Sequence, residues 1–133
     1  MKFVLDASVV IASERPIEPG HARSRAVVDR VLRGDDEIVV PALFGIEVVA
    51  ALARRGHDPI AVEQLVDALV APPAESLTLG PRRAKLVARF AARHRLRAAD
   101  ACYAWIASLR GVPLVTLDEE VLRRSPGGLA RLP

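Results

Sequence analysis

Residues 1–12 read MKFVLDASVVIA, a short apolar run that ends abruptly in a carboxylate at Asp6, followed by a hydroxyl at Ser8. Residues 3–5 (FVL) favour extended backbone and are apolar throughout, which is typical of a strand covered on both faces. A helical pattern begins directly after Asp6. Ligands of open α/β sheets bind at the carboxyl ends of the strands. The sequence therefore predicts that Asp6 lies at the mouth of a site.

The size and composition of the chain predict one globular domain. Its 133 residues suffice for one well-packed core, and we expect a single domain spanning residues 1–133. Hydrophobic residues make up 51% and charged residues 26%, unlike a disordered chain.

No apolar run approaches the roughly 20 residues that span a bilayer, and Asp6 interrupts the N-terminal one, so we expect a cytoplasmic protein. The single cysteine, Cys102, excludes an internal disulfide and a cysteine-cluster metal site.

Strand patterns alternate with helical patterns along the rest of the chain. Further strands are predicted at residues 37–40, 76–79, 112–117 and 129–132. Helices are predicted at residues 7–13, 21–32, 59–70, 82–94, 98–109 and 119–124, with another opening at Pro41 and ending before Gly56. This alternation predicts an α/β fold with a parallel central sheet and helices on both of its faces.

A second carboxylate, Asp118, ends a strand as Asp6 does. It follows the strand at 112–117, and Thr116 lies two residues before it as Ser8 lies two residues after Asp6. If the two strands are neighbours in a parallel sheet, their carboxylates converge at one edge.

Glu47 is an acid in the middle of an apolar helical pattern. Its neighbours one turn away are apolar or small: Leu43, Phe44, Ala50 and Ala51. A lone buried carboxylate is costly or becomes protonated, so this side chain needs a partner such as a cation.

Asp100 presents a similar anomaly, because Leu96 and Tyr103 flank it at helical spacing. Its expected place is the first turn of a helix, where stabilisation of the helix dipole or capping explains an acid equally well. Capping does not explain Glu47, which lies far from a helix end.

Several carboxylates gathered in one place repel one another unless cations intervene. An all-oxygen donor set suits a hard divalent cation, Mg²⁺ or Mn²⁺. Zinc is disfavoured because His21, His57 and His94 lack metal-ligand spacing. A carboxylate-held ion activates water and stabilises charge on a phosphoryl group.

The basic residues are mostly arginines, 17 of 19, and six of them crowd into sixteen positions: Arg82, Arg83, Arg89, Arg93, Arg95 and Arg97. Arginine favours bidentate contact with phosphate, which indicates a nucleic-acid partner, although a solvated helix face is an equally good interpretation of the charges alone. Together with the acids, the arginines favour phosphodiester hydrolysis.

Four motifs in order carry a family resemblance. They are DAS at residues 6–8, VPALFGIEVVAAL around Glu47, LRAADACYAWIA around Asp100 and VTLDEE around Asp118. The set resembles the PIN-domain ribonucleases of the VapC toxin family in both order and spacing, over almost the whole chain. Each motif alone is weak, but the ordered set is specific.

The resemblance implies a three-layer α/β/α domain and a site that binds one or two Mg²⁺ or Mn²⁺ ions through Asp6, Glu47, Asp100 and Asp118. It implies that Ser8 and Thr116 are supporting hydroxyls. It also implies cleavage of single-stranded RNA by metal-activated water, leaving a 5′-phosphate and a 3′-hydroxyl. The protein would be a homodimer neutralised by a cognate VapB-type antitoxin, whose extended segment, often with an arginine, lies near the acidic pocket.

Two departures from the family's pattern add predictions. Arg95 and Arg97 precede Asp100 and are predicted to contact RNA phosphate, the alternative being that they are solvated. Glu119 or Glu120 would add a ligand through water, or both are ordinary acids of a first helical turn.

Two other functions are compatible with an acid after the first strand or with this fold. One is an aspartyl-phosphate protein. A haloacid-dehalogenase-type phosphatase needs a second Asp where Ser8 stands, and a receiver domain needs a lysine late in the chain, but the only lysines are Lys2 and Lys85. A catalytically silent PIN-like module that binds RNA or protein is the other alternative, and the presence of all four acids argues against it.

Overall fold

The computed structural model describes all 133 residues, from Met1 to Pro133. Five strands form the sheet: β1 (Lys2–Leu5), β2 (Glu37–Pro41), β3 (Glu75–Leu77), β4 (Leu114–Val115) and β5 (Ala130–Arg131). The helices are α1 (Ala7–Ser13), α2 (His21–Leu32), α3 (Leu43–Ala53), α4 (Pro59–Val70), α5 (Pro81–His94), α6 (Ala98–Arg110) and α7 (Glu119–Arg124).

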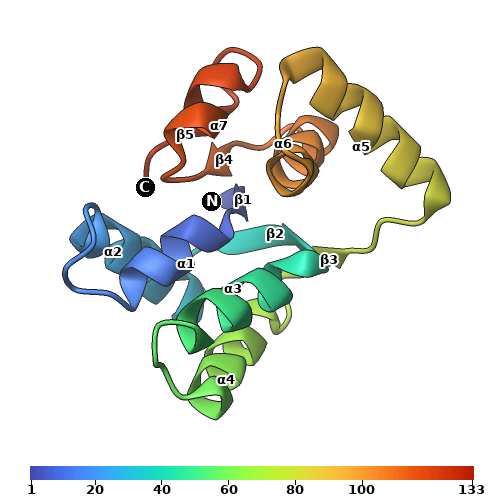
Figure 1. The fold of residues 1–133 in the computed structure, drawn as a ribbon. Coiled ribbons are helices and arrows are strands. Elements are labelled where there is room, and N and C mark those ends of the chain that lie inside the picture. The colour runs from blue at the N-terminus through green and yellow to red at the C-terminus, as the bar shows by residue number, and fades with distance from the viewer.

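The sheet is entirely parallel, with strand order β3-β2-β1-β4-β5, so that β1 lies at its centre. Phe3, Val4 and Leu5 of β1 are each at most 1% exposed because helices cover both faces. Helix α6 packs across β1, β2 and β4, while α1 to α4 pack together on the other side (Figure 1). The predicted α/β fold with a parallel sheet and flanking helices is therefore confirmed.

The predicted neighbour relationship of the first and fourth strands is also confirmed. β1 pairs with β4 in parallel, with Val4 opposite Leu114 and Leu5 opposite Val115. The chain segments that follow both strands therefore leave the sheet at the same edge, side by side.

Several predicted boundaries were wrong. β4 is only two residues long, because the amides of Leu117 and Asp118 bond to side-chain hydroxyls of Ser8 and Thr116 instead of a neighbouring strand. β3 ends at Leu77, where the chain departs toward α5.

The last predicted strand shortens to Ala130–Arg131, although it does pair with β4 at the sheet edge. Pro41 does not open a helix. It is the last residue of β2, opposite Leu77, and α3 begins at Leu43; a proline without an amide hydrogen is tolerated at a strand end.

Helix ends follow local chemistry. Asp58 caps α4 by accepting a hydrogen bond from the Ile60 amide at 3.1 Å, with Pro59 in the first turn. Gly111 ends α6 in the left-handed conformation, with φ of 62°. None of these helices is both long and apolar enough to cross a membrane.

Candidate active site

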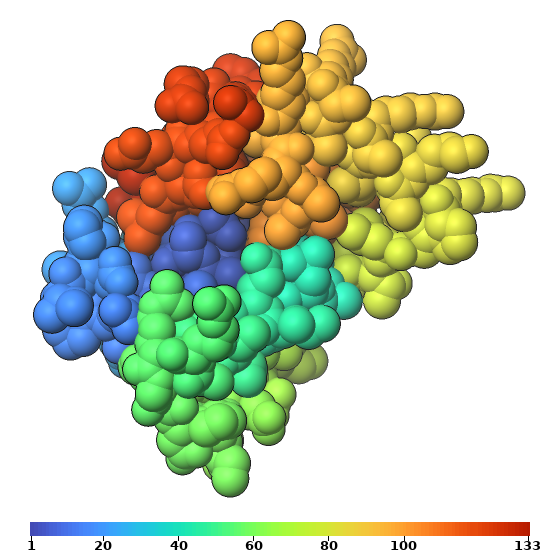
Figure 2. All heavy atoms as spheres, in the orientation of Figure 1, coloured from blue at the N-terminus to red at the C-terminus, as the bar shows by residue number.

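The four acids singled out from the sequence line one pocket. Asp6, Glu47, Asp100 and Asp118 come from the end of β1, from α3, from α6 and from the start of α7, and share a pocket of about 670 Å³. Figure 2 shows α1, α3, α6 and α7 meeting around the centre of this face. Four segments far apart in sequence thus bring carboxylates to the carboxyl edge of the sheet.

Asp6 is the most buried of the four acids. It is the N-cap residue of α1, yet its side chain makes no capping bond and remains available to the pocket. Its Oδ2 accepts hydrogen bonds from Ser8 Oγ at 2.8 Å and Thr116 Oγ1 at 2.5 Å. Burial raises the pKa of the Asp6 carboxyl, with the negative charge of Asp118 adding to it, although the two hydroxyls oppose the rise. The charged form of Asp6 is therefore short of positive partners.

Asp118 divides its two oxygens between two tasks. Oδ1 accepts from the amides of Glu120 and Val121, at 2.8 and 3.1 Å, and caps α7. Oδ2 faces the pocket, where it accepts a hydrogen bond from Arg97 at 2.6 Å. Capping thus fixes the orientation of a carboxylate whose other oxygen remains available for binding.

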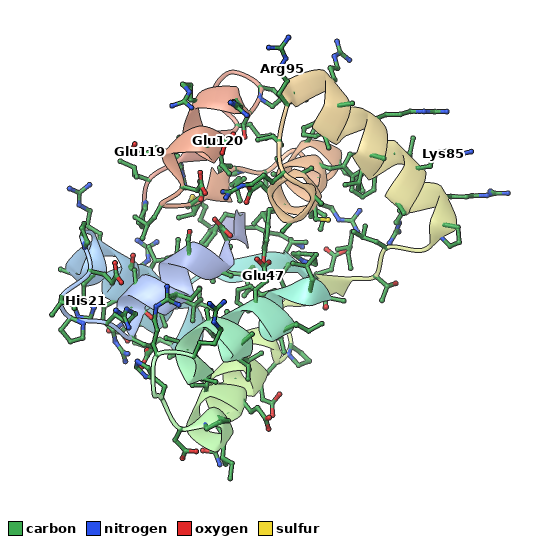
Figure 3. The ribbon with its side chains drawn as sticks, viewed as in Figure 1. His21, Glu47, Lys85, Arg95, Glu119 and Glu120 are labelled. Carbon is green, nitrogen blue, oxygen red and sulfur yellow. The ribbon has the colours of Figure 1, made fainter.

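Glu47 points from α3 toward the sheet edge (Figure 3). The buried hydroxyl of Tyr103 donates a hydrogen bond to its Oε1 at 2.7 Å. Burial raises the pKa of Glu47, and the charges of Asp6 and Asp100 raise it further, while the hydrogen bond from Tyr103 lowers it. The expected inward orientation of Glu47 is thus observed, and its hydrogen-bond donor comes from α6.

Asp100 occupies the first turn of α6 and makes no capping bond. Its Oδ2 accepts a hydrogen bond from Arg97 Nε at 2.8 Å. Burial raises the pKa of Asp100 and the charges of Asp118 and Asp6 add to it, against the opposing effect of Arg97. Asp6, Glu47 and Asp100 therefore all have raised pKa values because they are buried close to one another.

The predicted phosphate-contacting arginines lie in different places. Arg97 bridges Asp100 and Asp118 and lies 3.8 Å from Glu120, with 64% of its side chain exposed. Arg95, in the left-handed conformation with φ of 55°, points away from the pocket at the end of α5 (Figure 3). Of these two arginines, the structure brings only Arg97 to the acids.

Glu119 and Glu120 both lie in the first turn of α7. Glu119 is exposed and directed outward (Figure 3). Glu120 pairs with Arg124 and lies near Arg97. Neither of them lines the acidic pocket.

Sequence reasoning missed three functional candidates. Tyr103 lies one turn beyond Asp100 on α6, so its position on the same helical face was a usable signal. Arg54 and Arg55 line the pocket at the end of α3. Arg54 lies two turns after Glu47 and therefore shares its face, whereas nothing in the sequence distinguished Arg55.

The donor set fits a hard divalent cation, because four carboxylates line one pocket, where three arginines lie beside them: Arg54, Arg55 and Arg97. In the arrangement observed, no three of these acids lie close enough to share an ion. The Arg97 guanidinium instead supplies the positive charge at Asp100 and Asp118. A metal site built from these four acids would require the carboxylates to come closer together and Arg97 to leave Asp100 and Asp118.

Comparison with known families gives a direct result, because the PIN domain family model matches residues 3–126. This chain belongs to the PIN-domain family. The PIN-domain resemblance stated from the four motifs is thereby confirmed. No curated protein matches the sequence closely enough to count as a relative.

Two of the solved structures that match this chain illustrate its fold. PAE2754 from Pyrobaculum aerophilum aligns with a TM-score of 0.67 and 23% identity, covering 98% of this chain and 83% of that one. VapC20 from Mycobacterium tuberculosis, described as a sarcin–ricin loop cleaving toxin, aligns with a TM-score of 0.71 and 15% identity. That alignment covers 92% of this chain and 94% of VapC20. The likeness at these identities concerns the fold.

Proposed function

We propose that this PIN domain is a metal-dependent endoribonuclease that hydrolyses RNA phosphodiester bonds. The observation that carries the proposal is the convergence of Asp6, Glu47, Asp100 and Asp118 on one pocket, where burial and mutual repulsion raise the pKa of the first three. Such a pocket favours binding of a cation. Bound Mg²⁺ or Mn²⁺ would supply an activated water and stabilise the charge that develops on the phosphoryl group.

The chain's own residues hold this site in shape. Ser8 and Thr116 fix one oxygen of Asp6, and Tyr103 fixes one oxygen of Glu47. Such outer hydrogen bonds orient metal-binding carboxylates and support their charged form.

Substrate binding in this proposal uses the cations of the pocket. Arg97, Arg54 and Arg55 line the pocket, and a guanidinium suits bidentate contact with phosphate. Arg97 would leave Asp100 and Asp118 when metal binds and contact the RNA backbone instead. The side chain of Arg95 points away from the pocket, so any contact that it makes with phosphate would lie outside the cleavage site (Figure 3).

The biological role follows from the VapC resemblance. We propose a toxin of a type II toxin–antitoxin pair, a single PIN domain that acts in the cytoplasm as a homodimer and is inhibited by a cognate VapB-type antitoxin. The description of VapC20 as a toxin that cleaves the sarcin–ricin loop supports this role by analogy of fold.

The test is cleavage of a mixed single-stranded RNA by the purified protein, with Mg²⁺ or Mn²⁺ against chelator. Asp6→Asn serves as the inactive control because it removes charge at nearly constant shape. Metal-dependent cleavage that leaves 5′-phosphates and falls at least about a hundredfold in Asp6→Asn supports the proposal. Equal cleavage in Asp6→Asn, or cleavage in the presence of chelator, would contradict it. A folded wild type that binds RNA and cleaves none would instead support a silent binding module.

A further inference from the structure

Positive charge is strongly segregated along this chain. Residues 76–99 contain seven Lys or Arg and no Asp or Glu, whereas the other residues hold twelve basic against sixteen acidic side chains. The segment therefore carries +7 and the remainder −4. It includes all of α5, the helix that stands at the side of the molecule and packs chiefly against α6 (Figure 1).

Four of these cations form one row on α5. Arg82, Lys85, Arg89 and Arg93 follow one another at intervals of three, four and four residues, which places them on the same helical face. We call this row the α5 stripe. All four side chains are exposed, and Figure 2 shows long side chains of this helix projecting from the surface. Lys85 points away from the body of the protein (Figure 3). The stripe is about 16 Å long.

The α5 stripe has no negative partners. None of its side chains forms an ion pair or a hydrogen bond, whereas many basic side chains elsewhere are paired. Examples are Arg15 with Glu18, Arg25 with Glu14 and Asp29, and Arg33 with Asp35. Like charges one turn apart repel, so the stripe weakens its own helix rather than stabilising it. On other helices acids do stand at these spacings, as in the pairs of Arg25 with Asp29 on α2 and of Arg124 with Glu120 on α7.

We infer that the α5 stripe binds the phosphate backbone of the RNA substrate outside the cleavage site. The inference rests on the proposed function. Only three residues separate Arg93, at the end of the stripe, from Arg97, whose guanidinium reaches the acidic pocket, and exposed Arg95 is one of them. The segment that joins the stripe to the pocket thus carries a cation at every second position, Arg93, Arg95 and Arg97. Because phosphate contacts do not read bases, the stripe contributes affinity and not sequence choice.

A protein partner fits this face less well. The centres of protein interfaces are depleted of charge and enriched in aromatic and apolar side chains. Leu86, at 46%, is the one large apolar side chain of α5 that is exposed. A surface that is mostly arginine and contains no acid is the kind expected to bind a polyphosphate ligand.

The test measures RNA binding separately from cleavage. Fluorescence anisotropy with a labelled single-stranded RNA of about 25 nucleotides in EDTA, over a range of salt, compares wild type with Arg82→Gln/Lys85→Gln/Arg89→Gln/Arg93→Gln. Glutamine preserves helix propensity. We expect the Kd at low salt to rise at least tenfold, and the slope of log K against log salt to fall by about 2 to 3.

Two further variants make the result specific. Arg23→Gln/Arg25→Gln/Arg33→Gln/Arg131→Gln removes the same net charge from other surface positions and should change the Kd less than threefold. Arg82→Lys/Arg89→Lys/Arg93→Lys keeps the charge of the stripe and should bind RNA within about threefold of wild type. Circular dichroism and thermal unfolding confirm that each variant is folded.

Each outcome separates the inference from the proposed function. An unchanged Kd in the glutamine variant, or an equal loss in the variant of matched charge, overturns the role of the stripe, even if wild type cleaves RNA normally. Binding that depends on the stripe in a wild type without nuclease activity supports the inference and contradicts the nuclease. If the glutamine variant cleaves an RNA of about five nucleotides as wild type does, but cleaves the RNA of about 25 nucleotides more weakly, both the role of the stripe and the nuclease function are supported.

Discussion

The N-cap residues of two helices meet at the pocket: Arg97, which precedes α6, donates a hydrogen bond to Asp118, which caps α7, at 2.6 Å. The same guanidinium bonds to Asp100 at 2.8 Å. Arg97 thus neutralises two of the four carboxylates to which we assign metal binding. Because most of its side chain is exposed, no packing holds it there. A divalent cation and Arg97 would compete for the same oxygens.

Replacing Arg97 by alanine is expected to tighten Mn²⁺ binding several-fold, because the competing positive charge is removed. The same variant should bind single-stranded RNA more weakly, since a phosphate contact is lost. Isothermal titration calorimetry with Mn²⁺ and RNA anisotropy in EDTA measure the two effects separately. Arg95→Ala, outside the pocket, is the matched control and should leave Mn²⁺ affinity unchanged. Weaker Mn²⁺ binding by Arg97→Ala would show that the arginine assists the metal site.

Asp6→Asn is expected to raise the melting temperature of the metal-free protein. Burial raises the pKa of Asp6 in the folded state, so the folded protein holds this proton more tightly than the unfolded chain. The stability contributed by protonated Asp6 is present at low pH and is lost as pH rises through the folded-state pKa. Asparagine resembles the protonated form at every pH, so the variant keeps this stability at neutral pH. The measurement is thermal unfolding at neutral pH in EDTA.

Bound Mn²⁺ should make wild type more stable than Asp6→Asn. At a Mn²⁺ concentration of 100 times Kd, the free energy of unfolding of wild type rises by about 2.7 kcal/mol, and that of Asp6→Asn should rise much less. An Asp6→Asn variant that is less stable than wild type in EDTA, or that gains as much from Mn²⁺, would contradict the assignment of Asp6.

Tyr103→Phe is expected to lower cleavage about 10-fold while preserving the buried ring. The hydroxyl stabilises the ionised form of Glu47, so without it the pKa of Glu47 rises further. The acidic limb of the pH–rate profile should therefore move to higher pH, and activity should recover as the pH is raised. A loss of activity that is uniform across pH would indicate disturbed packing instead of lost support for Glu47.

Asp36→Asn is expected to reduce stability at neutral pH by about 1–2 kcal/mol. Burial alone would raise the pKa of this carboxyl, but hydrogen bonds and charges from the N-terminal ammonium and Arg30 outweigh it and hold the pKa below 3.8. A lowered pKa contributes stability above 3.8 that is lost as pH falls through the folded-state value.

Urea unfolding at neutral pH and at about pH 3 tests the Asp36 prediction, because the difference in free energy of unfolding between Asp36→Asn and wild type should shrink in acid. Asp35→Asn removes an exposed neighbouring acid, whose partner is Arg33, and should have little effect at either pH. An Asp36→Asn difference that is constant across pH would show that the ion pairs contribute little.

The alternating pattern of the sequence was enough to predict the α/β fold and the order of its elements. Continuous apolar strands require cover on both faces, and helices between them require parallel pairing, so local composition determined the architecture. The same logic predicted that Asp6 and Asp118 leave the sheet side by side, and the pairing of β1 with β4 confirms it. Glu47 was recognisable because an acid in an apolar helix needs a partner.

What the sequence could not determine were the contacts between side chains far apart in the chain. Tyr103 donates to Glu47 across 56 positions, and Thr116 donates to Asp6 across 110. Arg97 was predicted to contact phosphate, yet its partners in the folded protein are Asp100 and Asp118. Periodicity specifies which face a residue occupies, because it follows from the backbone repeat. Only the tertiary structure specifies which charged groups approach within hydrogen-bond distance, because that depends on how the helices pack across the sheet.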